Sequence, residues 1–370
     1  MSKTHELAGV IHCHSTYSDG AATVPEILRA AQQAGLEYLL LTDHDTLAPR
    51  APSAGRPGDS AQRGGSPGQG YQGGLLFLVG SEVSPPQNHY LVLGASDSPP
   101  RDWSLQRVID AAAAAGGIGF VAHPNDRGSR FMHVDSYPWR DQDVTGYTGI
   151  EVWNFFSQLL GEITSAPRAV RAALFPYTLV RGPQPETVAL WDRLGQQRRV
   201  PAIGGIDAHG LQRGLLWLPL VATNYRLALR SVWTHVLLPA KPNGDWQQDA
   251  ATVYEALAAG HVFISAPAAG DAHGFRFIAQ IRAGELQMGD EGRLEGQAAE
   301  LAVTCPGRAT VRLVRDGKTL ASKHGVRGFR LSVKEPGVYR VEVYRRRFFQ
   351  DHLWILSNPI YLRPQAGPPA

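Results

Sequence analysis

The sequence predicts an α/β protein in which a barrel of parallel strands and helices, residues 1–266, precedes a small antiparallel β domain, residues 271–365. Two observations predict this fold. Short apolar runs alternate with amphipathic helical patterns through the first part of the chain, which is typical of parallel α/β structure. After residue 270 apolar and polar residues alternate instead, as in strands exposed on one face. Residues 366–370 form a Pro- and Ala-rich tail.

Seven short, continuously apolar runs in the first part are predicted to be buried strands. They are Ala8–His14, Tyr38–Thr42, Leu75–Val79, Tyr90–Leu93, Ile118–Ala122, Gly149–Trp153 and Pro201–Gly205. Helices are predicted where apolar residues recur at three- and four-residue spacing. They are Val24–Ala34, Ser104–Ala115, Glu186–Gln196 and Thr252–Ala259, and the last stops at Gly260.

The second part is predicted to be a β-sandwich-like domain. Its expected strands are Phe275–Ile281, Leu301–Thr304, Thr310–Val314, Phe329–Val333 and Val338–Tyr344. The Asp-Gly pair inside Arg315–Lys318 predicts a hairpin turn between two of them. The segment Glu335–Val341 is typical of the turn into a strand of an immunoglobulin-like sandwich.

One segment of the first part, residues 48–74, breaks the alternation of strands and helices. It is rich in Gly, Ser, Pro, Gln and Arg and has no periodicity, which predicts a flexible loop. The segment closely follows His44, which is one of the candidate metal ligands named below, so it begins beside the expected active site. A mobile lid over that site is the alternative interpretation.

Composition restricts the class of protein. Hydrophobic residues make up 43% of the 370, enough for a sizeable core, and a net charge of +3 is no nucleic-acid signature. The basic run Arg345–Arg347 is interpreted as a solvated strand end. Cys13 and Cys305 are too few for a disulfide framework. With no signal-like stretch in residues 1–9 and no run long enough to span a bilayer, we expect a cytoplasmic protein.

Histidines and carboxylates gather at the ends of the predicted strands. In barrels of parallel strands the loops at the carboxyl ends build the active site, so side chains from many strands can converge on one point. Mixed imidazole and carboxylate ligands suit zinc, manganese or iron, and sulfur ligands are absent from the set. The candidate metal ligands are His12, His14, Asp19, His44, Glu82, His89, His123, Asp207 and His209.

Local spacing supports several of these assignments. His12 and His14 lie two residues apart on a predicted strand and should point to one face, while Cys13 points into packing. Asp207 and His209 repeat this spacing at the last strand end. Asp19, in the turn that follows His14, can reach back to the same pocket.

His44 lies in the run Thr-Asp-His-Asp, where a neighbouring carboxylate could orient its second ring nitrogen. Asp43 or Asp45 could be that acceptor, and Asp45 could equally cap the turn that follows. The remaining histidines His133, His235, His261 and His352 are interpreted as structural, and His133 shares a loop with Arg130.

The ordered motifs resemble the PHP family, named for its polymerase and histidinol phosphatase domains. They run from His12-x-His14 with Asp19, through Thr42-Asp43-His44, Glu82, His89 and Ala122-His123-Pro124, to Asp207-x-His209. The resemblance implies a distorted seven-stranded (β/α) barrel that holds two to three divalent transition metals. It implies one metal at His12, His14, Glu82 and Asp207, a second at Asp19, His44 and His209, and a third that Glu82 bridges to His89 and His123.

Further motifs resemble one branch of that family, which has a terminal β domain and includes carbaryl-hydrolase-like and phosphoesterase-like proteins. They are Glu151–Asn154, Pro201–Gly210, Gly260–Ser265 and Ser357–Tyr361. The same metal site can serve different substrates on related folds, so the resemblance leaves the substrate open.

The leading hypothesis is a metal-dependent phosphoesterase that hydrolyses a small phosphorylated molecule or nucleotide with a metal-bridging hydroxide. Arg127, Arg130 and Arg213 follow predicted ligands and could bind the phosphoryl group, although a surface salt bridge explains each equally well. Asp19 and His44, with Arg127 and Arg213, are the candidate catalytic residues. The alternatives are a carbamate, amide or ester hydrolase with the same metals and, with less support, a nuclease. A small-molecule substrate is the expected partner, without membrane or nucleic acid.

Overall fold

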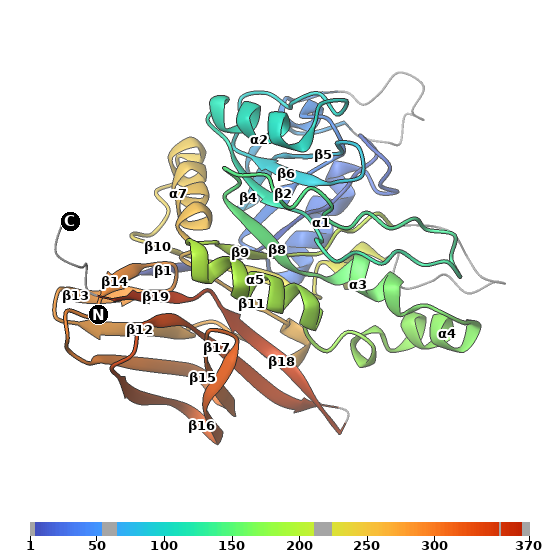
Figure 1. The fold of residues 1–370 in the computed structure, drawn as a ribbon. Helices are drawn as coiled ribbons and strands as arrows, with labels where there is room; N and C mark the ends of the chain where they lie inside the picture. The colour runs from blue at the N-terminus through green and yellow to red at the C-terminus, as the bar shows by residue number, and fades with distance from the viewer. Residues whose placement is uncertain (1–3, 54–64, 211–223, 348, 365–370) are drawn as a thin grey trace.

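The computed structural model describes residues 4–53, 65–210, 224–347 and 349–364 (Figure 1). The fold is mixed α/β. The described residues form a 14-stranded β-sheet and a second, five-stranded β-sheet. Figure 1 shows the C-terminal strands, in orange and red, packed together below the blue-to-yellow N-terminal part. In the described part of the chain no helix is both long and apolar enough to cross a membrane.

The larger sheet begins with strands close to the N-terminus. Parallel pairing joins β1 (His5–Ile11) to β2 (Tyr38–Leu41) and β2 to β4 (Leu75–Val79), whose Leu39 and Phe77 are in register. On its other side β1 pairs antiparallel with β10 (Trp233–Leu238), which pairs antiparallel with β11 (Val262–Ser265). Neither β10 nor β11 is among the strands that the sequence predicts.

The smaller sheet has the order β5-β6-β7-β8-β9. Its strands are β5 (Ser81–Val83), β6 (Tyr90–Leu93), β7 (Ile118–Val121), β8 (Gly149–Asn154) and β9 (Ala202–Gly205). The last three are parallel, but β6 runs antiparallel to both of its neighbours. The expectation of purely parallel strands is wrong here, because the short connection between β5 and β6 has no room for a crossover.

The two sheets share one apolar core. Its members alternate along the strands, so that one face of each strand is turned inward. The shared core includes Ile11, Leu40, Leu78, Leu91, Phe120 and Ile203. Backbone bonds also join the sheets: Ile206 N donates to Ile11 O at 3.1 Å, and Gly80 N donates to Leu41 O at 2.8 Å.

The helices surround these strands, and four of the seven described helices lie where the sequence predicts a helix, whereas three were not predicted. The helices are α1 (Val24–Ala34), α2 (Leu105–Ala114), α3 (Phe155–Glu162), α4 (Ala166–Leu174), α5 (Pro185–Gln197), α6 (Tyr225–Ala228) and α7 (Trp246–Ala259), with short 3-10 turns at Ala48–Arg50, Pro176–Thr178 and Pro267–Ala269. Helix α1 shows why its ends could be predicted. Thr23 and Glu26 form a capping box at its start, and Gly35, with φ of 80°, ends it in the left-handed conformation.

The C-terminal strands extend the larger sheet. They are β12 (Arg276–Ile281), β13 (Gly284–Gln287), β14 (Glu291–Arg293), β15 (Ala299–Arg315), β16 (Lys318–Val333), β17 (Gly337–Arg347), β18 (Gln350–Ser357) and β19 (Ile360–Arg363). The predicted hairpin turn joins β15 to β16, with positive φ at Asp316 and Gly317. Strand β18 pairs with β11, so hydrogen bonding crosses the expected boundary between the two parts.

The segment 48–74 is only partly irregular. Residues Gly70–Gln72 form β3, which pairs antiparallel with β4. The flexible loop predicted for residues 48–74 therefore extends too far at its C-terminal end. The described parts are also anchored by side chains: Arg50 Nη2 donates to Ala95 O at 2.7 Å, and Ser66 N donates to the Tyr17 hydroxyl at 3.0 Å. Residues 54–64 lie outside the described part of the chain.

Candidate metal centre

The candidate ligands follow the strand ends on short segments of unusual backbone. His12, His123 and Asp207 come directly or almost directly after β1, β7 and β9, and their φ angles are positive, at 66°, 25° and 51°. Non-glycine residues adopt this region at a cost on the order of 1–3 kcal/mol each, a strain that concentrates at functional sites. Backbone bonds hold it: Asp207 N donates to His12 O at 2.7 Å, and His14 N donates to Ala208 O at 3.0 Å.

This geometry corrects one reason for pairing His12 with His14. The sequence placed both on one strand, but β1 ends at Ile11. Their side chains converge because the chain turns at His12, and not because strand residues alternate. Their Nε2 atoms lie 3.1 Å and 3.2 Å from the same carboxylate oxygen, Glu82 Oε2.

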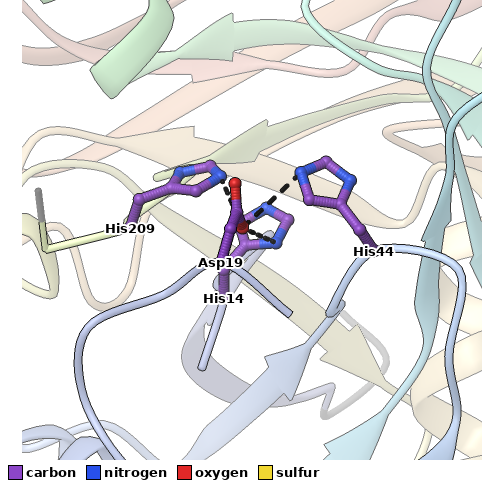
Figure 2. A group of neighbouring side chains, drawn as sticks. All are labelled: His14, Asp19, His44 and His209. Carbon is purple, nitrogen blue, oxygen red and sulfur yellow. Dashed lines mark ion pairs between the residues drawn. The ribbon is translucent and has the colours of Figure 1, made fainter. Parts of the chain in front are cut away.

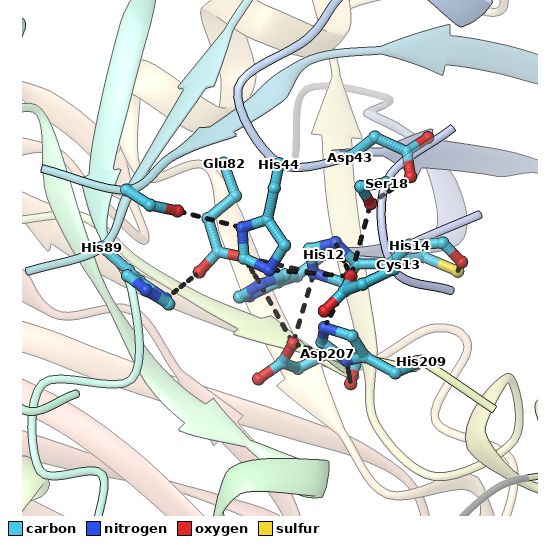
Figure 3. Close-up of polar contacts among 12 residues, drawn as sticks. His12, Cys13, His14, Ser18, Asp43, His44, Glu82, His89, Asp207 and His209 are labelled. Atoms are coloured by element: carbon cyan, nitrogen blue, oxygen red, sulfur yellow. Dashed lines mark hydrogen bonds and ion pairs between the residues drawn. The ribbon is translucent and has the colours of Figure 1, made fainter. Parts of the chain in front are cut away.

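Glu82, on the short strand β5, lies at the middle of the site (Figure 3). It is fully buried, and each of its two oxygens faces several imidazoles. Oε1 lies 2.9 Å from His89 Nδ1 and 3.1 Å from His123 Nε2, and Oε2 lies 3.1 Å from His12 Nε2, 3.2 Å from His14 Nε2 and 3.4 Å from His44 Nδ1. One carboxylate therefore connects residues from both sheets.

Asp19 forms a second centre on the outer side of the site (Figure 2). Its side chain is more than half exposed, and Oδ1 lies 3.3 Å from His209 Nε2, 3.8 Å from His44 Nε2 and 3.9 Å from His14 Nδ1. The His14 and His209 rings stack with centroids 4.0 Å apart. The turn that carries Asp19 thus brings it to three histidines from separate segments.

The candidate ligands fall into three overlapping groups, in each of which one potential ligand atom per residue lies within 4.8 Å of the others. The groups are His12, His14, Glu82 and Asp207; His14, Asp19, His44 and His209; and Glu82, His89 and His123. The structure thus brings together all nine residues selected from the sequence, in groups matching those that the resemblance implied, apart from His14, which belongs to two.

Several buried atoms of these groups are suited to bind a metal. Among the described residues, His12 Nε2, both ring nitrogens of His14, Glu82 Oε2 and His123 Nδ1 have no hydrogen-bond partner of acceptable geometry. A buried polar atom without a partner costs about 1–3 kcal/mol. Unsatisfied imidazole nitrogens beside carboxylates are the donor set that divalent transition metals prefer, so the residues fit such ions.

Two buried residues outside the predicted set orient these ligands. Glu151 Oε1 lies 2.8 Å from His12 Nδ1, and Glu151 Oε2 accepts from His123 N and from Asn154 Nδ2, both at 2.8 Å. Asn154 Nδ2 also donates to Asp207 Oδ2 at 3.2 Å. Because a carboxylate can only accept, His12 carries its proton on Nδ1 and presents Nε2 to the site. Glu151 follows the strand-end pattern in the sequence, and that was the signal that could have identified it.

The acceptor expected for His44 is wrong. Its Nδ1 lies 3.0 Å from Ser84 Oγ, and Asp45 accepts instead from Ser84 N at 2.9 Å. Asp43 is turned toward the segment before Asp19, where its carboxylate accepts from Ser15 N, Ser15 Oγ and Ser18 Oγ. Asp43 therefore fixes the turn that carries Asp19, and it does not orient His44.

The carboxylates shift the pKa values of the buried histidines. Burial by itself lowers the pKa of His12, but Glu151, Glu82 and Asp207 raise it well above its usual value. The same competition between burial and neighbouring carboxylates raises the pKa of His14 and of His123 to about 9. Burial would raise the pKa of Glu82, yet the surrounding imidazoles hold it well below the usual range. A metal entering the site must therefore displace protons.

The groups border a cavity of about 290 Å³. Besides the candidate ligands it is lined by Asp126, His133, Val134, Asp135, Tyr137, Phe156, Ser157 and Leu160. His133, which the sequence led us to interpret as structural, lies on this wall. Buried Cys13 packs in the apolar cluster beside α1, as expected, and burial raises the pKa of its thiol well above the usual value.

Of the three candidate arginines, the two that the structure describes do not line this cavity. Arg127 is exposed and its Nη2 lies 2.9 Å from Glu186 Oε1, which is the surface salt bridge of the alternative interpretation. Arg130 is exposed and is not among the lining residues. Arg213 lies outside the described residues. His235 and His261 pair with Glu6 and Asp290, each at 2.9 Å, and His352 is buried away from the cavity.

Sequence comparison identifies one known domain in this chain. Residues 11–116 match the PHP domain. This segment contains six of the nine candidate ligands, from His12 to His89. No curated protein is significantly similar to the chain.

Two solved structures resemble the fold at low sequence identity. One, from Bacteroides vulgatus, is a two-domain protein containing a predicted PHP-like metal-dependent phosphoesterase; it is 16% identical, with a TM-score of 0.45 over 96% of this chain and 95% of that one. The other, from Bifidobacterium adolescentis, is a proposed metal-dependent phosphoesterase; it is 17% identical, with a TM-score of 0.35 over 57% of this chain and 91% of that one. Both TM-scores are below 0.5, so neither likeness bears on the activity of this chain.

Proposed function

We propose that this chain is a metal-dependent hydrolase of the PHP type that cleaves a phosphate ester of a small molecule. The observation that carries the proposal is the set of buried, unsatisfied imidazole nitrogens that converge on Glu82 and Asp207 beside an open cavity. Packing alone does not account for this set, because each unsatisfied buried atom destabilises the fold. The match of residues 11–116 to the PHP domain supports the same reading.

The strand pairing supports a distorted seven-stranded barrel as the scaffold. If β4 and β5, which are separated only by Gly80, count as one strand, pairing runs from β1 through β2, β4 with β5, β6, β7, β8 and β9. The bonds Ile206 N to Ile11 O and His14 N to Ala208 O then return to the first strand. On this proposal the candidate ligands lie at one end of the barrel, where its active site belongs.

The three groups would hold two to three divalent ions, of which zinc, manganese and iron suit mixed imidazole and carboxylate ligands. Such ions, when bound, lower the pKa of coordinated water and stabilise negative charge on substrate oxygens. Glu82 would serve two groups, and His14 would serve two as well. Asp19 is the most exposed of these ligands and lines the cavity.

Several residues outside the three ligand groups would position the ligands or exchange protons. Glu151 fixes the tautomer of His12, and Asn154 connects Glu151 to Asp207. Asp43 anchors the turn of Asp19 through three hydrogen bonds. Phe156 packs on the His209 ring, with centroids 5.6 Å apart, and shields that ligand from water. His133 lines the cavity and could exchange a proton with a leaving group.

A carbamate, amide or ester hydrolase with the same metals is the second candidate. Among the described residues that line the cavity there is no arginine or lysine, so charge stabilisation by a guanidinium is not part of the described site. A carbamate develops charge on a single oxygen in its tetrahedral intermediate, which makes fewer demands on cationic side chains. The lack of a cationic side chain among the described lining residues therefore gives the carbamate, amide or ester hydrolase more support than the sequence alone gave it.

The test is elemental analysis of the purified protein followed by a screen of substrates. Phosphomonoesters, phosphodiesters, carbamates and amides should be compared at equal metal occupancy. We expect two to three transition-metal ions per chain and faster cleavage of a phosphate ester than of the carbamate. Metal content below one ion per chain after reconstitution would overturn the proposal, and faster carbamate cleavage would select the second candidate.

Both cysteines are free thiols, which is consistent with the cytoplasmic location that we propose.

A further inference from the structure

The cavity beside the candidate metal centre is lined by two unlike kinds of residue. The imidazoles and carboxylates of the three ligand groups form one kind. Val134, Tyr137, Phe156 and Leu160 form the other, which we call the apolar wall. Leu160 and Phe156 are buried, whereas 41% of the Tyr137 surface remains exposed.

The rings of the apolar wall are already oriented by the site itself. Tyr137 stacks on His89 with centroids 4.7 Å apart and planes inclined by 16°. Phe156 stacks on His209 with planes inclined by 28°. Each aromatic side chain therefore lies against a candidate ligand, and a group attached to a substrate oxygen at the metals would meet these rings.

The backbone behind the wall is fixed by hydrogen bonds to two polar side chains that also line the cavity. Asp126 Oδ2 accepts from Tyr137 N at 2.8 Å, and Asp126 Oδ1 accepts from Ser157 Oγ at 2.5 Å and from Gly128 N at 3.2 Å. Trp139 N donates to Pro124 O at 3.0 Å. Asp126 and Ser157 thus satisfy each other, although both line the cavity.

This arrangement leaves few partners for the hydroxyl groups of a sugar or polyol. Among the described lining residues outside the ligand groups, the polar groups that these bonds leave free are the side chains of His133 and Asp135 and the hydroxyl of Tyr137, and all three residues are exposed, so no buried partner remains for a hydroxyl that packs against the wall. A buried hydroxyl without a partner is costly, whereas a flat apolar ring gains from contact with aromatic side chains.

We infer that the substrate carries a flat, apolar ring on the ester oxygen, and that this ring packs on Tyr137 and Phe156. The inference rests on the proposed function, because the metals would hold the acidic part of the substrate. It narrows the substrate to aryl or similar planar esters, as opposed to esters of sugars or polyols. Asp126 is a positioning residue for Tyr137 and does not contact the substrate.

The test compares two phosphonates that are not hydrolysed and differ only in the ring. Phenylphosphonate and methylphosphonate are titrated calorimetrically into metal-reconstituted protein at one pH. We expect phenylphosphonate to bind about tenfold more tightly, which corresponds to ~1.4 kcal/mol. In Tyr137→Ala the ratio should fall to about threefold or less, while methylphosphonate binds as in the wild type.

Phe131→Ala is the matched control, because Phe131 is an exposed aromatic residue on the same segment that does not line the cavity. It should keep the wild-type ratio. Phe156→Leu provides a second variant, and Tyr137, being exposed, can be replaced with little risk to folding. Equal binding of the two phosphonates to the wild type would overturn this inference and leave the proposed function standing. Binding of neither by metal-loaded protein would overturn both.

Discussion

Replacing Glu151 with glutamine tests whether the candidate centre depends on a residue that binds no metal itself. The exchange preserves shape and removes the charge. The Glu151 carboxylate receives three buried hydrogen bonds, from His12 Nδ1 on one oxygen and from His123 N and Asn154 Nδ2 on the other. An amide has only one oxygen, so it cannot satisfy all three donors.

The amide can take two orientations, and each has a cost. If its oxygen faces His12, His123 N loses its acceptor, at about 1–3 kcal/mol, and Asn154 Nδ2 keeps only its bond to Asp207 Oδ2. If its oxygen faces those two donors, its NH₂ group faces His12 Nδ1, which must then accept. The proton of His12 moves to Nε2, the nitrogen that lies 3.1 Å from Glu82 and 3.3 Å from Asp207, and that nitrogen can no longer bind a metal.

We therefore expect Glu151→Gln to lower metal affinity about 10- to 100-fold, as is typical for the partners of metal-binding histidines. That range corresponds to ~1.4–2.7 kcal/mol. The assay is competition with a chromophoric chelator, combined with elemental analysis of bound metal. Glu162→Gln is the control, since Glu162 pairs with Arg168 away from the cavity. Metal affinity within threefold of the wild type, with unchanged stability of the metal-free protein, would refute this reasoning.

Three further predictions concern the same site. Asp207→Ala and His14→Ala should each remove at least one ion per chain and abolish most activity, because His14 belongs to two ligand groups; full metal content in the double variant would contradict the assignment. The metal-free protein should lose stability as pH rises from about 6.5 to about 9, since the raised pKa values of His14 and His123 stabilise it fully below the unfolded value and no longer above the folded one. Each histidine contributes at most ~3 kcal/mol, measurable by urea unfolding, and bound metal should remove the dependence; a flat profile in the metal-free protein would count against these protonated histidines. Arg127→Met should change phosphoesterase turnover less than about twofold, because Arg127 is engaged by Glu186 at the surface, and a tenfold loss in steady-state assays would return it to the substrate site.

Local features of the chain could be predicted from the sequence. The bounds of α1 were predicted correctly, because Thr23, Glu26 and Gly35 encode its ends. Strands such as β4 and β6 were also predicted at their observed bounds. Eight of the nine candidate ligands could be selected because each lies beside an apolar run, a pattern that strand packing does not require, and Asp19 because it lies in the turn after His14.

Pairing between distant segments could not be read in this way. Hydrophobic periodicity reports that a strand is buried, and it does not report its neighbour. The antiparallel β10 beside β1, and β18 beside β11 across the expected boundary, follow from contacts between residues that are 90 or more positions apart. The irregular composition of residues 48–74 likewise concealed β3, whose three residues are held by pairing with β4.

The roles of individual side chains likewise depend on contacts between segments that are distant in the chain. The sequence alone determined which imidazoles and carboxylates lie at strand ends, because that choice is local. Only the tertiary structure decided that Glu82 connects both sheets, that Glu151 orients His12, that Ser84 replaces Asp43 beside His44, and that Arg127 turns away to Glu186. Such partners are set by distances of about 3 Å between residues far apart in the chain, and a shift of one residue in register would change them.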